Sequence, residues 1–213
     1  FSGDEPLVQA FREGVDVHKQ TASVIFEVPL EQVTSEQRGQ AKTINFATLY
    51  GQGAFSLARQ LGIGRDEAKA FIDQYFEHFR GVRAYLDEQI ATAREKGFVE
   101  TLMGRRRYIP ELRAKNWNVR QFGERVAQNT PIQGTAADMI KKAMIDVAQA
   151  LAEMNTGARM LLQVHDELLF EVPEGEEDAL AELVVSRMEG AVELSVPLVA
   201  EGGVGKSWYD TKG

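Results

Sequence analysis

The hydrophobic period changes once along the chain, and this change limits the possible folds more than any other feature. Up to residue 153 apolar side chains recur at helical spacing, as in Arg65–Phe79 and in the stretch from Thr135 to Glu153. Beyond it, Ala158–Val164 and Leu168–Val172 are apolar runs of strand length that flank a short polar segment. Helices followed by a β-hairpin predict an α+β fold with an antiparallel sheet.

Individual residues set the predicted element boundaries. Thr34 and Gln37 have the spacing of a capping box, so a helix should begin at Ser35 and run to Tyr50. Pro131 should break a helix that covers Asn118–Asn129, with Thr135 capping the next one. The remaining predicted elements are helices at Glu5–Phe11, Asp16–Ile25, Val82–Lys96 and Asp178–Leu194, a hairpin of Phe98–Leu102 with Arg107–Ile109, and a last strand at Pro197–Glu201.

Composition narrows the class of protein. The 213 residues contain no cysteine, which excludes disulfides and favours a reducing cytoplasm. No apolar run approaches the roughly 18 residues of a membrane span, so no membrane partner is expected. Net charge is −8, yet the stretch from Arg105 to Arg125 holds seven cations against two acids. Such a local basic surface can bind phosphates although the whole chain is acidic. The chain opens at Phe1 without Met, which suggests excision from a longer protein.

Four residues at four-residue spacing make the first candidate site. Arg38, Lys42, Phe46 and Tyr50 lie on one predicted helix, where each step of four advances the side chain by only about 40°. Two cations and two rings on one face suit a nucleoside triphosphate, with phosphates at the cations and sugar and base between the rings. The same spacing also fits a helix whose rings belong to the core and whose cations are solvated.

A second candidate site combines Arg125, Asn129 and Gln133. Arg125 and Asn129 share a predicted helix face, and Gln133 follows the expected break at Pro131. These side chains can donate hydrogen bonds to minor-groove acceptors that all base pairs share, which tests pair geometry without reading sequence. Alternatively, the two amides satisfy backbone groups at helix ends.

The third candidate is His165-Asp166-Glu167, between the two apolar strands. A carboxylate at a tight turn between buried strands is held rigidly and suits Mg²⁺, which prefers oxygen ligands. An Asp in a turn also occurs for conformational reasons alone, and His165 could be an ordinary turn residue.

Together and in this order, the three patterns resemble DNA polymerase family A. The matching text is Arg38-Gly-Gln-Ala-Lys42-Thr-Ile-Asn-Phe46-Ala-Thr-Leu-Tyr50-Gly51, the stretch from Arg125 to Asp138, and Gln163-Val-His165-Asp166-Glu167. Shorter stretches such as Asp16–Ala22 also match, so the similarity covers essentially the whole chain. One departure is Ala47, where the family usually has Gly.

The resemblance implies helical fingers over residues 1–116 and part of a palm with an antiparallel sheet over 117–213. It implies that Arg38 and Lys42 grip an incoming dNTP, with Phe46 beside its sugar and Tyr50 near the template base. By the same resemblance, Lys42, Asp166 and Glu167 are catalytic, and Asp166 binds Mg²⁺. Primer–template DNA would contact Arg125, Asn129, Gln133 and His165.

The implied activity is template-directed DNA synthesis, by two-metal nucleotidyl transfer from dNTP to a primer 3′-hydroxyl. The family's second metal-binding Asp belongs to a motif expected upstream of Phe1, so this chain alone should be inactive. The complete enzyme would be a cytoplasmic monomer for replication and repair. Three alternatives stay open: a single-subunit RNA polymerase, a non-catalytic nucleic-acid-binding module, and a metal-dependent nuclease.

Overall fold

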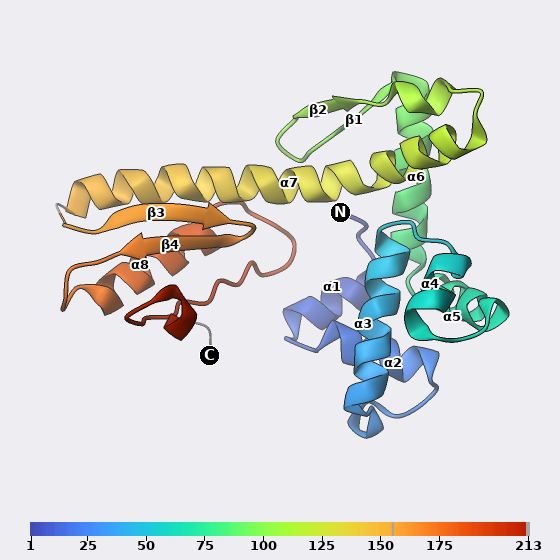
Figure 1. Cartoon of the computed structure of the whole chain (residues 1–213), viewed down its shortest axis with the longest axis horizontal. Coiled ribbons are helices and arrows are strands. Elements are labelled where there is room, and N and C mark those ends of the chain that lie inside the picture. The colour runs from blue at the N-terminus through green and yellow to red at the C-terminus, as the bar shows by residue number, and fades with distance from the viewer. Residues whose placement is uncertain (155, 212–213) are drawn as a thin grey trace. The chain divides into compact units, whose positions relative to one another are not determined.

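The computed structural model describes residues 1–154 and 156–211. These residues form two compact units, Phe1–Gly134 and Thr135–Gly213. The fold is α+β as predicted, mostly helical with two small antiparallel sheets (Figure 1). The fingers and palm boundaries at 1–116 and 117–213 stay a prediction, and residues 155, 212 and 213 of that palm portion lie outside the described residues.

The first unit begins with a group of helices. They are α1 (Glu5–Arg12), α2 (Val17–Ile25), the 3-10 turn η1 (Leu30–Gln32), α3 (Ser35–Leu49), α4 (Ala54–Leu61), α5 (Arg65–His78) and α6 (Arg80–Lys96). All except α4 and η1 were predicted, and the capping box of Thr34 and Gln37 is present. Ile44, Leu57, Tyr75, Phe79 and Leu86 form the centre of their shared core. This core fixes which face of α3 remains outside.

A small hairpin follows α6. Helix α6 ends at Lys96 as predicted, and Gly97 follows it in the left-handed conformation, with φ +82°. Strands β1 (Phe98–Glu100) and β2 (Arg106–Tyr108) pair antiparallel, and the 3-10 turn η2 (Pro110–Arg113) comes after them. Val99 and Ile109 are buried in a second core cluster with Ala127.

The predicted break at Pro131 is wrong. Helix α7 runs without interruption from Trp117 to Met154, with Pro131 inside it, and Thr135 is a buried interior residue and no N-cap. A proline inside a helix costs about 3 kcal/mol through a lost hydrogen bond and a ring clash. Buried positions at Ala127, Thr130 and Pro131 continue at helical spacing to Thr135 and Asp138. Packing along this face outweighs the local cost.

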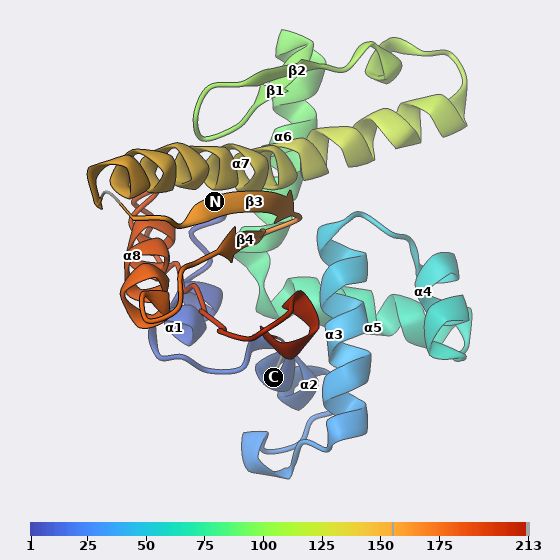
Figure 2. The same ribbon diagram turned by 60° about the vertical axis from the view of Figure 1, so that its left-hand side comes forward.

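In the second unit, β3 (Arg159–Val164) and β4 (Glu167–Glu171) form the predicted antiparallel hairpin, and α8 (Glu177–Glu189) lies beside it (Figure 2). Val147, Leu180 and Val184 are the buried residues of their core. Two predictions fail here. Helix α8 ends at Glu189, five residues before Leu194. Pro197–Glu201 pairs with no strand in the described part of the chain, and its Val199 is 72% exposed. The 3-10 turn η3 (Trp208–Thr211) follows.

Candidate functional site

The predicted stripe on α3 exists as a surface. Arg38 and Lys42 are exposed, Phe46 is 43% exposed, and Tyr50 is half-buried at the C-cap. The Phe46 and Tyr50 rings stack with centroids 6.1 Å apart and planes 8° from parallel. Ile44 and Ala47 on the other side of the helix are buried. We call Arg38, Lys42, Phe46 and Tyr50 the α3 stripe.

Asp16 holds one end of the α3 stripe. Its Oδ2 accepts a hydrogen bond of 2.6 Å from Arg38 Nε, and its Oδ1 caps α2 by accepting from the His18 and Lys19 backbone N–H groups. Burial raises the pKa of Asp16, but the hydrogen bonds from Arg38 and Lys19 lower it more, so it stays below its ordinary value. Lys42 makes no ion pair with any residue of 1–154 or 156–211. The α3 stripe thus presents one paired and one unpaired cation.

His18 of α2 lies beside the α3 stripe. Its ring centroid is 5.9 Å from that of Phe46, and its Nδ1 is 2.8 Å from the amide Nδ2 of Asn45. Burial lowers the pKa of His18, the Asp16 carboxylate raises it, and the charges of Arg38 and Lys42 lower it further. Together these effects leave the pKa of His18 below that of a free histidine, which favours the neutral imidazole. Sequence reasoning noted this segment only as a matching stretch and assigned it no role.

The second candidate set lies on one face of α7. Because the helix continues through Pro131, Arg125, Asn129 and Gln133 follow one another at four-residue spacing, and Gln133 does not lie beyond a break as predicted. Arg125 and Gln133 are exposed. The buried Oδ1 of Asn129 has no hydrogen-bond partner in the described structure. A buried amide atom without a partner loses free energy unless water or a ligand satisfies it.

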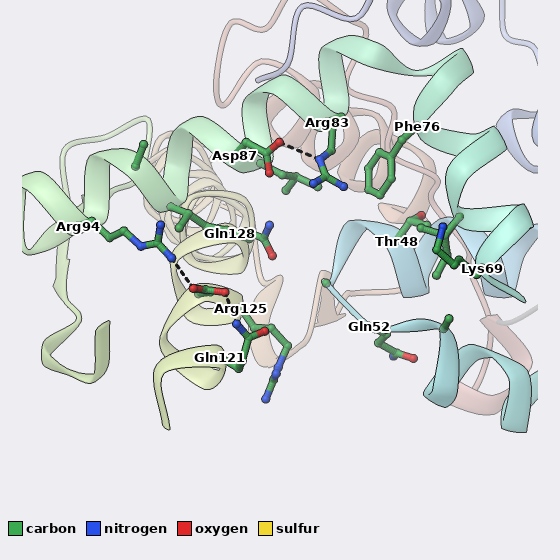
Figure 3. Close-up of a pocket in the computed structure, with 18 of the residues that line it drawn as sticks. Thr48, Gln52, Lys69, Phe76, Arg83, Asp87, Arg94, Gln121, Arg125 and Gln128 are labelled. Carbon is green, nitrogen blue, oxygen red and sulfur yellow. Dashed lines mark hydrogen bonds and ion pairs between the residues drawn. The ribbon is translucent and has the colours of Figure 1, made fainter. Parts of the chain in front are cut away.

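Arg125 also lines a hollow of about 740 Å³ in the first unit (Figure 3). Five cations line this hollow: Arg65, Lys69, Arg83, Arg94 and Arg125. Asp87 and Glu124 are the acids that line it, paired with Arg83 at 2.8 Å and Arg94 at 2.5 Å. Figure 3 shows Arg83 between Asp87 and the ring of Phe76, over which its guanidinium lies at 5.1 Å. The hollow therefore combines excess positive charge with an aromatic wall.

Gly51 connects the α3 stripe to the hollow. It follows Tyr50 with φ +68°, and a Cβ there would lie 2.6 Å from Gln128 Oε1 and 3.3 Å from Arg125 Cγ. Other residues rarely adopt this backbone conformation, and a side chain here would have to displace that of Gln128. The first two candidate sets are thus adjacent, through a contact that sequence spacing could not indicate.

The third candidate set lies at the β3–β4 turn. Val164 pairs with Glu167, so the turn consists of His165 and Asp166 alone, and Glu167 is the first residue of β4 and not part of the tip. His165 has φ +55°, a conformation that only a few per cent of residues other than glycine adopt. Its carbonyl accepts a 2.5 Å hydrogen bond from Gln163 Nε2. His165, Asp166 and Glu167 are all exposed.

No group of three or more His, Cys, Asp or Glu that could hold a metal occurs among the described residues. The residue type at Asp166 fits a hard divalent cation, because it is an exposed carboxylate residue at a turn that backbone pairing fixes. By itself it offers one carboxylate, fewer ligands than such an ion takes. None of the helices in residues 1–154 and 156–211 has the length and apolar character needed to cross a membrane.

Comparison with known proteins decides the family. The model of DNA polymerase family A matches residues 1–210. This chain belongs to DNA polymerase family A. DNA polymerase I of Bacillus subtilis (strain 168) is 53% identical over 212 residues, which is 100% of this chain and 24% of that protein. DNA polymerase I of Pseudomonas aeruginosa is 51% identical over 205 residues, 96% of this chain and 22% of that protein.

A solved structure of the family shares the fold. The POL domain of Pol1 from M. smegmatis, in complex with DNA primer-template and dNTP, has a TM-score of 0.94 at 48% identity. The match covers 99% of this chain and 37% of that one. This chain therefore spans about a quarter of the length of the DNA polymerases I that it matches. The family prediction made from the motifs is confirmed.

Proposed function

We propose that this chain is part of a DNA-directed DNA polymerase, which transfers a nucleotidyl group from dNTP to a primer 3′-hydroxyl. The observation that carries the proposal is the α3 stripe: two exposed cations followed by two stacked rings on one helix face, in a chain of DNA polymerase family A. The related M. smegmatis domain was solved with a DNA primer-template and dNTP, which supports the same partners here. A cytoplasmic monomer remains part of the proposal.

The α3 stripe would bind the dNTP. Lys42, without an ion-pair partner in the described chain, would meet the triphosphate, and Arg38 would join it on release from Asp16. Both cations stabilise negative charge that develops on the leaving pyrophosphate, which gives Lys42 its catalytic role. Phe46 would lie beside the sugar and Tyr50 near the template base.

Primer–template DNA would contact α7. Arg125, Asn129 and Gln133 follow one helix face, so they can test the minor-groove acceptors of successive base pairs. The Asn129 Nδ2 group would donate to these acceptors, whereas its buried Oδ1, itself an acceptor, cannot pair with them. The cations of the adjacent hollow suit the phosphates of the same DNA.

The β3–β4 turn would hold Mg²⁺ through Asp166, with Glu167 beside it and His165 at the primer end. Mg²⁺ supplies activation of the 3′-hydroxyl and neutralisation of phosphate charge when it is bound. Two such ions need more carboxylates than Asp166 and Glu167, so we propose that residues outside this chain complete the site and that the chain alone extends no primer.

Primer extension tests the proposal. The complete polymerase should extend a DNA primer on a DNA template with dNTPs, and chelation of divalent metal should stop the reaction. Extension with NTPs only would favour an RNA polymerase. DNA binding without extension would favour a non-catalytic module, and shortening of the DNA would favour a nuclease.

A further inference from the structure

An aspartate near the start of the chain joins the N-terminal ends of two helices. Asp4 is only 5% exposed. Its Oδ1 caps α1 by accepting a 3.2 Å hydrogen bond from the N–H of Leu7. Its Oδ2 accepts a 2.8 Å hydrogen bond from the N–H of Gly81, the second residue of α6, which lies 77 positions away. One buried carboxyl group therefore serves two helix ends that are distant in sequence.

The start of α6 depends on this distant acceptor. The first four N–H groups of a helix have no partner within it. The N-cap residue of α6 is Phe79, whose side chain has no hydrogen-bond acceptor. Phe79 is also the whole connection between α5, which ends at His78, and α6, which begins at Arg80, and its φ of −100° and ψ of 65° are not helical. The backbone thus turns at one residue, and the bond from Gly81 to Asp4 helps to fix the new direction.

Close packing at Gly81 accompanies the hydrogen bond. A Cβ at Gly81 would lie 2.9 Å from both Cα and Cβ of Asp4, atoms that cannot move aside as the end of a flexible side chain can. Phe1 continues the contact one turn further along α6, where its ring centroid is 5.8 Å from that of Tyr85. The first residues of the chain therefore lie along the start of α6.

Helix α6 connects the two core clusters of the first unit. Val82, near its start, is buried in the cluster that contains Ile44 and Ala47 of α3. Ala93, near its end, is buried with Ala127 of α7 in the second cluster. The direction of α6 therefore influences where the α3 stripe lies relative to the part of α7 that precedes Thr135.

An ion pair holds the other end of α6. Arg94, in its last turn, donates a 2.5 Å hydrogen bond to Glu124 Oε1, and Gln121 donates one of 2.7 Å to Glu124 Oε2 (Figure 3). Glu124 directly precedes Arg125, which belongs to the proposed DNA-contacting face of α7. The 17 residues of α6 span about 25 Å, so contacts at both ends determine its direction more closely than one contact could.

We propose that Asp4 is a positioning residue, which fixes the start of α6 and thereby the placement of the α3 stripe relative to the α7 face of Arg125, Asn129 and Gln133. The inference rests on the proposed function, because these two surfaces would hold the dNTP and the base pairs beside it. Asp4 itself touches neither dNTP nor DNA. Its loss should therefore impair discrimination between correct and incorrect dNTP, which depends on the relative placement of the two surfaces.

Hydrogen exchange in the complete polymerase tests the contact. Asp4→Ser keeps a cap for α1 but has a single, shorter-reaching oxygen, so it should release the Gly81 N–H. The first turn of α6 should then exchange roughly tenfold faster or more, as expected for loss of a hydrogen bond to a carboxylate. Helix α8 should exchange as in the wild type. Asp66→Ser, an exposed acid in the first turn of α5, is the matched control and should change neither helix.

Gly81→Ala tests the same contact from the side of α6. Alanine normally stabilises a helix relative to glycine, but here the added Cβ would push Asp4 away. The urea midpoint should therefore fall for Gly81→Ala and rise for Gly39→Ala, since Gly39 is a helical glycine whose Cβ would meet no neighbouring atom within 4 Å. The double variant of Asp4→Ser and Gly81→Ala should lose little more than the worse single variant, because both remove one contact. Losses that simply add would contradict this.

Single-turnover incorporation of correct and incorrect dNTP tests the consequence for function. The ratio of the two rates should fall severalfold in Asp4→Ser and in Gly81→Ala, with the Kd for primer–template DNA close to that of the wild type. Loss of folded enzyme would lower both rates alike and leave their ratio unchanged, so the ratio separates positioning from stability. Asp4→Asn keeps the size and one acceptor oxygen, so it should show the same change to a smaller extent even if Asp4→Ser does not fold.

A wild-type rate ratio in Asp4→Ser together with faster exchange in α6 would leave Asp4 as a stabilising cap only, and the proposal would fall. Unchanged exchange in the first turn of α6 would also refute it. A wild-type enzyme that extends no primer would refute the proposed function instead, whereas hydrogen exchange reports on the contact between Asp4 and Gly81 regardless of activity.

Discussion

The α3 stripe and the β3–β4 turn hold their polar side chains in different ways. The α3 stripe is supported by side chains: Asp16 holds Arg38, and the buried Asn45 holds His18 against Phe46. The turn is supported by backbone pairing, and Asp166 is exposed at its tip. We therefore expect α3 to be sensitive to substitutions behind its surface, and the turn to be sensitive mainly at the carboxylate itself.

The largest effect should come from the turn. Asp166→Asn removes the negative charge that we propose binds the metal, so primer extension by the complete polymerase should fall below detection while thermal unfolding is unchanged. Asp178→Asn, an exposed carboxylate at the start of α8, is the control and should extend normally. Extension by Asp166→Asn at the wild-type rate would exclude a metal role for this turn.

Lys42→Ala should cost several orders of magnitude in the single-turnover incorporation rate, because this cation has no substitute on the α3 stripe once Arg38 is engaged. Arg59→Ala, an exposed cation on α4 outside the stripe, should leave the rate unchanged. Equal rates for wild type and Lys42→Ala would remove Lys42 from the chemistry.

Phe46→Tyr should change selectivity and leave the incorporation of dNTPs nearly unaltered. Phe46 has no hydroxyl to replace the 3′-OH that a dideoxynucleotide lacks, whereas tyrosine supplies one, so the variant should accept dideoxynucleotides more readily. Competition between dNTP and ddNTP in primer extension measures the ratio. If both proteins discriminate equally, the ring does not lie beside the sugar.

A smaller effect concerns pH. Burial lowers the pKa of His18 below its ordinary value of 6.5, so below that pH the unfolded chain binds a proton more readily than the folded one. The free energy of unfolding should therefore fall as the pH drops below 6.5. His18→Gln should flatten this slope in urea unfolding; an equally steep slope would assign it to other groups.

The smallest effect should come from the strained turn residue. His165→Gly relieves the positive φ, which costs about 1–2 kcal/mol, but adds freedom to the unfolded chain worth about 0.5–1 kcal/mol. The free energy of unfolding should rise by about 1 kcal/mol or less. A clear loss of stability would show that the imidazole makes contacts that outweigh the strain.

Local signals predicted much of the fold. The capping box at Thr34 placed the start of α3, and α6 ends at Lys96 as predicted, because these helix ends depend on hydrogen bonds and φ angles close in sequence. Helix α4 was not predicted, although Ala54, Leu57, Ala58 and Leu61 have helical spacing. The break predicted at Pro131 was wrong because packing against residues distant in sequence outweighs the local cost of a proline inside a helix.

The candidate site shows the same difference between features with a local signal and contacts between residues distant in sequence. The four-residue spacing was enough to find the α3 stripe, and apolar runs were enough to find the turn at Asp166. The partners of these residues could not be found, because Asp16 and Asn45 are joined to Arg38 and His18 by contacts across 22 and 27 positions. Contacts between residues so far apart leave no repeating pattern that could be recognised in one sequence.

Gly51 has a consequence for how this chain can vary. Its backbone angle strains any other residue and a Cβ would have to displace the end of the Gln128 side chain at 2.6 Å, while a methyl group added at Gly39 on α3 or at Gly64 before α5 would meet no neighbouring atom within 4 Å. A saturation library selected for polymerase activity should therefore recover mostly glycine at position 51 and a broad range of amino acids at 39 and 64. Variants selected to use other nucleotides should therefore retain Gly51 and differ at other positions.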